Sequence, residues 1–472
     1  MTDAPAPTAS ARPWEGRRLH VLGIAGAGMS ALAVLARGLG AEVTGSDRAE
    51  SRYLDGVREA GIAVTIGHDA ANVPAGDDVE VVRSTAIPDD NPERVEARRR
   101  GLPDVSRHAL LGDVCAAHRV IAVAGAHGKT TTSAMVVHAL QGAGEDPSYL
   151  VGGILRSTGR NVHVGRSPWL VVEADESDRS FLETRPEIAV VTNVELDHHG
   201  TYGSLGELED AFRTFLAGAR ERVVWADPTL DRLLPPAASV PGEGDGTPGA
   251  LLGGGAAHRY DVAALEARDG ASRFVVGDHE VALRQPGLHN ARNAAGALTA
   301  AALTGADAAA SAAAMASFPG TGRRFEQIGV AGGATIVDDY AHHPTEVAAT
   351  IAAARTLAPR RVVAVFQPHL YSRTRYLGDA FGAALATADV VAVLDVYPAR
   401  ERAEDFPGTD GLTVARAAAD HGHGRTVLWL PTIADAVERL PGVLRAGDLC
   451  LCMGAGNVDA VARGLVGAPA PA

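Results

Sequence analysis

Short apolar runs alternate with longer amphipathic or alanine-rich stretches along almost the whole chain. The runs that we expect to be strands are 19–22, 42–47, 119–124, 170–173, 188–193, 335–337, 362–366, 390–394 and 449–453. Apolar runs separated by helical stretches are typical of parallel sheets with helices between the strands. The pattern therefore predicts an α/β protein.

Three glycine-rich turns, beginning at Gly23, Gly125 and Gly454, lie between a predicted strand and a predicted helix. The first helix is expected to reach Leu39 and to end at Gly40. We predict three domains: a Rossmann-like domain over 19–117, a central P-loop ATPase-like domain over 118–319 and a Rossmann-like C-terminal domain over 320–465. Residues 1–18 and 466–472 are expected to be a disordered leader and tail, and the Pro/Gly-rich residues 235–255 a mobile loop.

Composition excludes several classes of protein. The formal net charge is −14 and no long basic block is present, so nucleic-acid binding is not expected. The leader lacks an apolar core, and the alanine-rich stretch 294–318 is broken by Gly296, Gly305 and Asp307, which predicts a pair of soluble helices and no membrane span. Three cysteines, with Cys450 and Cys452 expected on one strand face, fit reduced thiols. We expect a cytoplasmic enzyme.

The second glycine turn carries the strongest chemical signal. Gly128-Lys129-Thr130 matches the end of a phosphate-binding loop, in which backbone N–H groups cradle phosphates, the lysine reaches them and the hydroxyl faces Mg²⁺. The full motif places glycine where Val123 stands, so the loop is shorter than usual. Lys129 is the single lysine among 43 basic residues. The strand before the loop and the helix after it favour nucleotide binding.

Acidic residues and histidines follow two other predicted strands. Glu173 ends one of them, where P-loop proteins hold Mg²⁺. Glu176 and Asp178 could instead be ordinary solvated acids at a strand end. His198 follows the strand 188–193 within a group of acids and histidines, and we interpret it as a ligand of a second divalent metal rather than as a structural residue.

The first glycine turn contains Gly26-x-Gly28-x-x-Ala31, and Asp47 follows at the spacing of a ribose-binding acid. Taken alone, this pattern indicates a nicotinamide-dependent dehydrogenase. The same turn can bind the diphosphate of any nucleotide, including a UDP-sugar. A dehydrogenase would leave Lys129-Thr130 unexplained, and a P-loop switch or motor protein would leave the first and third domains unexplained.

Taken together, the motifs resemble those of the Mur ligases. The matching segments extend from Gly23 to Asn457 in one order: 26–30, 125–132, 173–178, 192–198, 289–293, 320–325, 338–346, 366–369, 395–398 and 454–457. The resemblance implies a three-domain cytoplasmic ligase of peptidoglycan precursor synthesis. Such an enzyme joins L-alanine to the lactyl carboxylate of UDP-N-acetylmuramate through an acyl phosphate, with release of ADP and phosphate. It would use ATP with Mg²⁺, or Mn²⁺, and would be a monomer or weak homodimer.

The resemblance also assigns site residues. Those expected at the UDP-sugar are Gly26, Ala27, Gly28, Met29, Ser30, Ser46, Asp47, Ser84 and Thr85. Those expected at ATP are Gly125, Ala126, His127, Gly128, Lys129, Thr130, Thr131, Asn290, Asn293, Arg324 and Asp339. Tyr340, His342 and Arg373 are expected at L-alanine, and Thr130, Glu173 and His198 at the metals. The catalytic set is Lys129, Glu173, His198 and Arg324.

Two features bear on which ligase of the family the chain resembles. Several Mur ligases that add later residues use a second, carbamylated lysine near the metals, and this chain has none. The absence does not exclude the murein tripeptide ligase, which acts on the same UDP-sugar. Relatives often carry arginine where Leu370 stands, which leaves Arg373 and Arg375 as candidates for binding the alanine carboxylate.

Overall fold

The computed structural model describes residues 12–197, 201–234, 257–268 and 270–467. It divides into two compact units. The first consists of Met1–Glu195, Gly206–Asp261 and Ala294–Ala314, and the second of Leu196–Leu205, Val262–Asn293 and Met315–Ala472. Within the described ranges, no helix has the length and apolar character needed to cross a membrane.

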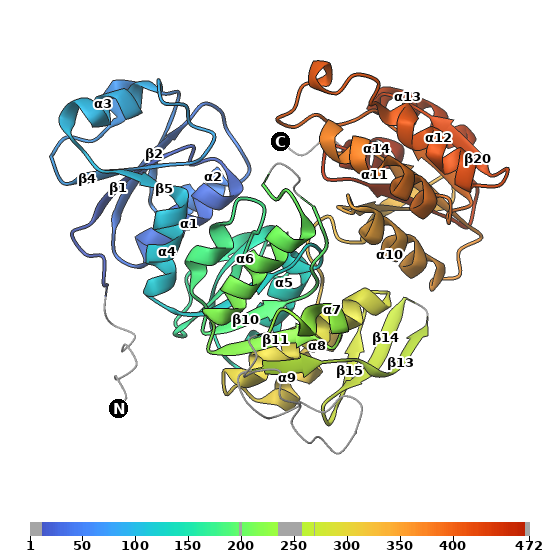
Figure 1. Ribbon diagram of the computed structural model, residues 1–472, viewed down its shortest axis with the longest axis horizontal. Coiled ribbons are helices and arrows are strands. Elements are labelled where there is room, and N and C mark those ends of the chain that lie inside the picture. Colours follow the sequence, from blue (N-terminus) through green and yellow to red (C-terminus); the bar gives the residue numbers. More distant parts are fainter. Residues whose placement is uncertain (1–11, 198–200, 235–256, 269, 468–472) are drawn as a thin grey trace. The chain divides into compact units, whose positions relative to one another are not determined.

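The first unit begins with a parallel sheet in the order β3-β2-β1-β4-β5 (Figure 1). Its elements are β1 (Arg18–Leu22), α1 (Ala27–Gly38), β2 (Glu42–Asp47), α2 (Leu54–Glu59), β3 (Ala63–Ile66), η1 (Ala70–Asn72), β4 (Val79–Arg83), α3 (Pro92–Arg100), β5 (Asp104–Ser106) and α4 (Arg107–Ala116). The strand order reverses between β1 and β4. In open α/β sheets, ligands bind beyond the carboxyl ends of the strands at such a reversal.

A second sheet of this unit has the order β12-β11-β10-β6-β9-β7-β8, with β8 antiparallel to β7. Its elements are β6 (Arg119–Ala124), α5 (Lys129–Gly142), β7 (Ser148–Leu155), β8 (Arg160–His163), β9 (Trp169–Glu173), η2 (Ser180–Thr184), β10 (Ile188–Val191), α6 (Leu205–Ala217), β11 (Glu221–Trp225), α7 (Pro228–Asp231) and β12 (Ala257–Tyr260). Because β6 pairs in parallel with β9 and β10, the turns after these three strands emerge at one sheet edge.

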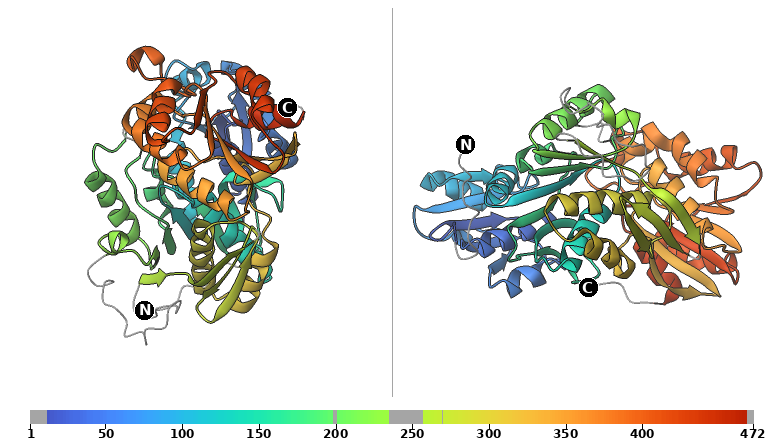
Figure 2. Two further views of the ribbon diagram at one scale, coloured as in Figure 1. Left: turned by 90° about the vertical axis from the view of Figure 1, so that its right-hand side faces the viewer. Right: turned by 90° about the horizontal axis from the view of Figure 1, so that it is seen from below.

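The second unit contains a small antiparallel sheet and a larger mixed sheet. The small sheet comprises β13 (Ala263–Arg268), β14 (Ala271–Val276) and β15 (His279–Leu283). The larger sheet has the order β16-β17-β21-β18-β19-β20 and carries helices on both faces (Figure 2). Its strands are β16 (Glu326–Ala331), β17 (Ala334–Asp339), β18 (Arg361–Phe366), β19 (Val390–Val393), β20 (Thr426–Trp429) and β21 (Asp448–Met453).

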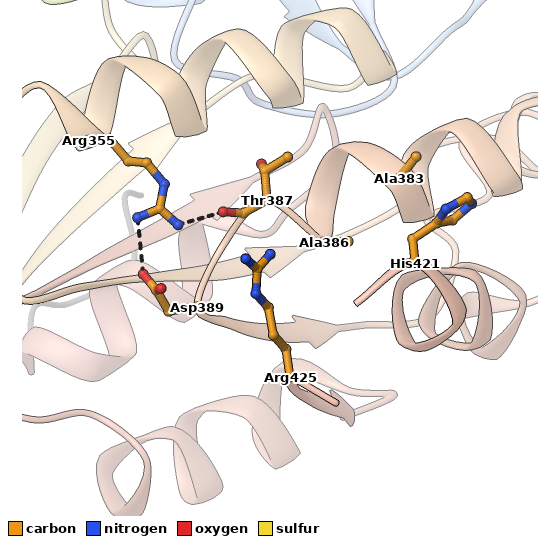
Figure 3. A pocket seen from close by; sticks show the side chains of 7 residues that line it. All are labelled: Arg355, Ala383, Ala386, Thr387, Asp389, His421 and Arg425. Carbon is orange, nitrogen blue, oxygen red and sulfur yellow. Dashed lines mark hydrogen bonds and ion pairs between the residues drawn. The ribbon is translucent and has the colours of Figure 1, made fainter. Parts of the chain in front are cut away.

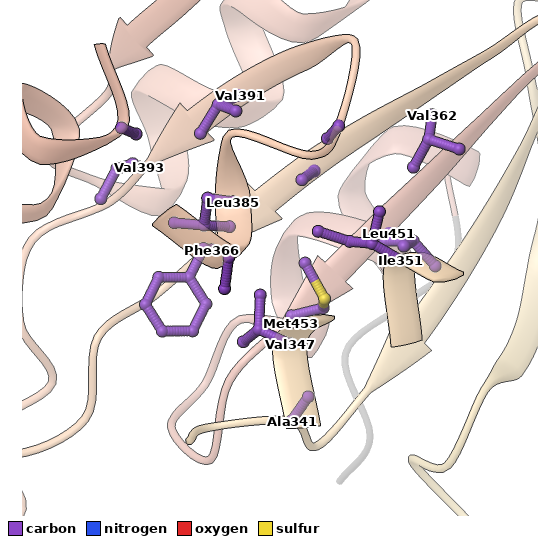
Figure 4. Close-up of a cluster of buried hydrophobic side chains, with 14 of the residues drawn as sticks. Ala341, Val347, Ile351, Val362, Phe366, Leu385, Val391, Val393, Leu451 and Met453 are labelled. Carbon is purple, nitrogen blue, oxygen red and sulfur yellow. The ribbon is translucent and has the colours of Figure 1, made fainter. Parts of the chain in front are cut away.

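The helical elements that complete the chain are α8 (Leu288–Leu303), α9 (Ala308–Ala314), η4 (Met315–Ser317), α10 (Pro344–Arg355), α11 (Tyr371–Leu385), η5 (Ala403–Asp405), α12 (Gly411–His421), α13 (Ile433–Arg439), η6 (Leu440–Gly442) and α14 (Asp459–Val466). Successive residues of the larger sheet point to opposite faces. Val362 and Phe366 of β18 pack towards α10, α11 and α12 (Figure 4), whereas Val363 and Val365 pack towards α13 and α14. This alternation produces the two-faced core of a doubly wound domain.

The structure confirms several of the sequence predictions and corrects others. α8 and α9 form the predicted helix pair, broken at Gly305; Gly296 lies inside α8, where a Cβ would lie 2.9 Å from Cζ of Tyr260. Cys450 and Cys452 are buried in one core cluster, as expected.

The predicted disordered ends are wrong in part. Residues 12–18 are ordered, since the N–H of Trp14 donates to the carbonyl of Leu39 at 3.1 Å and Arg17 pairs with Glu80 at 2.8 Å. At the other end, α14 extends to Val466. Residues 1–11, 468–472 and the predicted loop 235–255 lie outside the described residues.

Candidate active site

The loop between β6 and α5 has a backbone that only glycine adopts readily at two positions. Gly125 and Gly128 have φ of 139° and 80°. A Cβ at Gly125 would lie 2.2 Å from Oγ1 of Thr192, so the turn also needs a residue without a side chain. The loop N–H groups therefore lie at the amino end of α5, where the helix dipole favours anions.

Two residues after β10 hold this loop in place. The side chain of Asn193 accepts from the N–H of His127 at 2.9 Å and donates to its carbonyl at 3.0 Å, and Thr192 donates to the same carbonyl at 2.6 Å. The sequence alone places these two residues at the end of the predicted strand 188–193 and in a matching segment but gives them no role, and the structure ends β10 at Val191. The signal for a role at the site was their position directly after β10, a strand that neighbours β6.

Lys129, the first residue of α5, has its ammonium group within 2.9 and 3.0 Å of both carboxylate oxygens of Glu176. It also donates to the carbonyl of Gly125 at 2.7 Å. Burial opposes the charge, but the carboxylates of Glu176, Asp175 and Glu173 outweigh it and raise the pKa of Lys129. The site thus holds a permanent cation beside a loop suited to phosphate.

The interpretation of Glu176 and Asp178 as solvated strand-end acids is wrong. Glu176 is only 2% exposed and is committed to Lys129. Asp178 accepts from Arg107 and His108, each at 2.9 Å. Sequence reasoning missed Glu176 as a site residue because its burial depends on how the chain turns after β9.

A hydroxyl and a carboxylate converge next to Lys129. Oγ1 of Thr130 donates to Oε1 of Glu173 at 2.9 Å, and Oε2 of Glu173 accepts from the N–H of Gly152 at 2.5 Å. Oxygen ligands such as carboxylates and hydroxyls are those that Mg²⁺ prefers, so the oxygens of Thr130 and Glu173 fit a hard divalent cation. His198, the third expected ligand, lies outside the described residues.

The expected UDP-sugar residues gather at the carboxyl edge of the first sheet. Oδ2 of Asp47, the last residue of β2, accepts from the N–H of Ala25 in the glycine turn at 2.9 Å. A Cβ on Gly23 would lie 3.3 Å from Oγ of Ser84, so the turn and the end of β4 are adjacent. Thr85 is exposed beside Ser84. Ser46 is fully buried, and its hydroxyl donates to Glu93 at 2.7 Å.

The remaining residues of this group belong to the glycine turn and to the first turn of α1. Gly26 is the N-cap of α1, which begins at Ala27. Gly28 lies close to the guanidinium of Arg107, since a Cβ there would be 3.1 Å from its Nε. Met29 and Ser30 are buried, and the Ser30 hydroxyl donates to the carbonyl of Ala27 at 3.0 Å.

In the second unit, Asp339 organises the turn that carries Arg324. Its two oxygens accept from the N–H groups of Phe325 at 2.7 Å and Ala341 at 2.8 Å. Burial raises the pKa of Asp339. The guanidinium of Arg324 lies 5.0 Å from the ring centre of Tyr340 and 3.7 Å from Glu346. Asp339 thus holds the backbone directly after Arg324 and directly after Tyr340.

His342 lies beside the same carboxylate. Its Nδ1 is 2.9 Å from the carbonyl of Tyr340 and 3.2 Å from Glu346. Burial lowers the pKa of His342 to about 3, so the ring is neutral at pH 7. Because Nδ1 faces a carbonyl oxygen, it carries the ring proton, and Nε2 is the acceptor nitrogen.

Arg373 of α11 is buried and already has a carboxylate partner. Its Nη2 and Nε donate to Asp197 at 2.8 and 3.2 Å, and its Nη1 lies 3.3 Å from Nδ1 of His369. The neighbouring Leu370 has a φ of 69°, which is rare for a residue with a branched side chain. The amino-acid carboxylate expected at Arg373 would therefore replace or share the bond with Asp197.

Asn290 and Asn293 lie on the first turns of α8 and are 7% and 8% exposed. Nδ2 of Asn290 donates to the carbonyl of Pro286 at 2.8 Å.

A surface cavity of about 540 Å³ in the second unit is lined by Arg355, Ala383, Ala386, Thr387, Asp389, His421 and Arg425 (Figure 3). It contains none of the expected site residues.

Comparison with known proteins covers nearly the whole chain. Three family models match in succession: "Mur ligase family, catalytic domain" over residues 18–119, "Mur ligase middle domain" over 123–301 and "Mur ligase, glutamate ligase domain" over 323–456. A UDP-N-acetylmuramate–L-alanine ligase of Mycobacterium sp. (strain JLS) is 41% identical, covering 97% of this chain and 96% of the relative. The enzyme of the same name from Nocardia farcinica is 41% identical, covering 95% and 94%.

Solved structures agree with this match. The UDP-N-acetylmuramate–alanine ligase of Thermotoga maritima is 28% identical with a TM-score of 0.76, covering 95% of this chain and 98% of that one. A murein peptide ligase from Psychrobacter arcticus is 24% identical with a TM-score of 0.64, covering 97% and 100%. At 24% identity, the likeness to the murein peptide ligase shows a shared fold and no more.

Proposed function

Because the chain belongs to the Mur ligase family, we propose that it joins L-alanine to the lactyl carboxylate of UDP-N-acetylmuramate, with conversion of ATP to ADP and phosphate. The observation that carries the proposal is the 41% identity to ligases of that name over 97% of the chain. The charged Lys129 beside an anion-binding loop supports it, because the reaction needs a cation at transferring phosphates.

The chemistry explains why the enzyme needs ATP. A carboxylate resists attack by an amine until one of its oxygens becomes a good leaving group. Transfer of the γ-phosphoryl group to that oxygen releases ADP and forms an acyl phosphate. The alanine nitrogen then attacks the acyl carbon and loses a proton, and the C–O bond to phosphate breaks as the amide forms. Positioning and charge supply most of the catalysis in such a transfer.

We assign the ATP phosphates to the loop 125–131 and to the ammonium group of Lys129. In this proposal Glu176 orients the lysine and keeps it charged. Thr130, Glu173 and His198 would hold two Mg²⁺ ions, for which Mn²⁺ could substitute, and the ions would supply positive charge at the phosphates. Arg324, Asn290, Asn293 and Asp339, which belong to the second unit, are also assigned to ATP.

Tyr340, His342 and Arg373 are assigned to alanine. His342 is neutral at pH 7, so its Nε2 can accept a hydrogen bond from the ammonium group of the amino acid. Arg373 pairs with the alanine carboxylate in competition with Asp197.

We propose that the enzyme acts in the cytoplasm. We also propose that it is a monomer or weak homodimer, and sedimentation of the purified chain would test this oligomeric state.

The test measures ADP release with ATP, Mg²⁺ and UDP-N-acetylmuramate against a panel of alanine, glycine, serine and the murein tripeptide. The proposal expects release that requires both the UDP-sugar and alanine. Faster turnover with the tripeptide would instead assign the chain to the murein tripeptide ligases. ATP hydrolysis indifferent to both substrates would refute a ligase.

A further inference from the structure

A buried carboxylate contacts Ser46 of the expected UDP-sugar site and takes no part in the chemistry proposed above. Glu93, in the first turn of α3, has no exposed surface. Its Oε2 accepts from Nε2 of His20 at 2.9 Å and from the hydroxyl of Ser46 at 2.7 Å. Its Oε1 lies 3.0 Å from Nδ1 of His68 and accepts hydrogen bonds from further groups.

Two of those further donors come from the segment after β3. The N–H of Asp69 and the side-chain amide of Asn72 donate to Oε1 of Glu93 at 3.2 and 3.0 Å. Burial alone would raise the pKa of Glu93, but the donors outweigh it and lower the pKa to about 2. The group is therefore ionised at pH 7, and each contact is a charge-assisted hydrogen bond.

The donors belong to segments that meet at one edge of the first sheet. Ser46 is next to Asp47 at the end of β2, and the N–H of Gly67 donates to the carbonyl of Asp47 at 2.7 Å. Asp47 in turn accepts from the N–H of Ala25 in the glycine turn. Hydrogen bonds to Ser46 and Asp47, which are neighbours in the chain, thus connect Glu93 to the glycine turn at the expected nucleotide site.

We propose that Glu93 is a positioning residue for UDP-sugar binding: it fixes the end of β2 and the segment 67–72 so that Asp47 and the glycine turn are preformed for the nucleotide. This inference rests on the proposed function. A preformed site avoids the cost of ordering these segments on binding. The effect belongs to binding of one substrate and leaves the phosphoryl-transfer groups of the central sheet unaltered.

The decisive variant is Glu93→Gln, which keeps the volume of the side chain and removes its charge. The N–H of Asp69 cannot become an acceptor, so the Gln oxygen must face Asp69 and its NH₂ group must face Ser46 and His20. We expect the KM for UDP-N-acetylmuramate to rise about tenfold, the effect of losing one charge-assisted bond. The KM values for ATP and alanine, and kcat, should stay within about twofold.

The matched control is Glu96→Gln, three residues along the same helix. Glu96 pairs with Arg99 at the surface, so its loss should leave all three KM values unchanged. Hydrogen exchange of the substrate-free proteins gives a second readout: Glu93→Gln should speed exchange at the amides of Ala25 and Gly67, and Glu96→Gln should not. If Glu93→Gln fails to fold, Glu93→Asp, which retains the charge but has a shorter reach, replaces it.

An unchanged KM for the UDP-sugar in a folded variant would overturn the inference, as would an equal rise in the KM for ATP. These outcomes differ from a failure of the proposed function, in which the unaltered enzyme would release no ADP with UDP-N-acetylmuramate and alanine. In that case the exchange experiment decides alone: unchanged protection at Ala25 and Gly67 would refute a positioning role.

Discussion

The ion pair between Lys129 and Glu176 gives a prediction that separates stability from catalysis. Their side chains are 14% and 3% exposed, and the ammonium group contacts both carboxylate oxygens at 2.9–3.0 Å. Lys129→Met would leave the buried carboxylate of Glu176 without its cation. Removing one partner of a buried pair costs about 3–5 kcal/mol, so we expect the free energy of opening of α5 and β9 to fall by that amount.

The double variant Lys129→Met/Glu176→Gln removes both charges. It should recover opening free energy to within about 1 kcal/mol of the unaltered protein, because neither charge of the buried pair remains. Activity should not recover, since the phosphates still lack their cation. Native-state hydrogen exchange measures the first quantity, and ADP release measures the second.

The control for these Lys129 and Glu176 variants is the exposed ion pair Arg119–Glu187, in which the arginine side chain is 42% exposed. Arg119→Met should cost no more than about 1 kcal/mol. A Lys129→Met variant that loses as little as this control would refute the reasoning. Recovery of ADP release in the double variant would show that the role given to Lys129 is wrong.

Three further predictions concern single residues. Lys129→Arg keeps the charge but changes its shape, so ADP release should be almost abolished while circular dichroism and thermal unfolding show a retained fold. Gly125→Ala places a Cβ 2.2 Å from Oγ1 of Thr192 at a φ of 139°, so ATP binding measured by calorimetry should be lost; binding within twofold of normal would contradict the close approach. His342 has its pKa lowered from 6.5 to about 3, so the unfolded chain binds its proton first and stability should fall as pH decreases from 6.5 towards 3, by up to about 1.4 kcal/mol per pH unit. In His342→Gln, urea unfolding at pH 7 and pH 5 should show a smaller loss; an unchanged loss would exclude this residue as its source.

Local sequence predicted much of the fold. The strands at 42–47 and 119–124 have the predicted bounds. The second is an apolar run that ends at a glycine turn, as is typical of a buried parallel strand. The close packing of Gly296 of α8 against Tyr260 was not predictable, because the two residues are distant in the sequence. Propensity is a local property, and tertiary contacts can override it.

The candidate site divides in the same way. Lys129, Thr130 and Glu173 were predictable because a phosphate loop and a strand-end acid are contiguous patterns. Glu176 and Asn193 were not, because burial and hydrogen-bond partners depend on which strands become neighbours of β6. The same holds for Asp197, whose pairing with Arg373 joins residues far apart in the chain.

Patterns of neighbouring residues were enough to predict the α/β architecture, the position of the phosphate loop and the single lysine within it. Folding sets which carboxylate, Glu176, pairs with that lysine and which one, Glu93, is buried against Ser46. The physical reason is that backbone conformation follows from neighbouring residues, whereas the charge state and orientation of a side chain follow from groups brought together by folding.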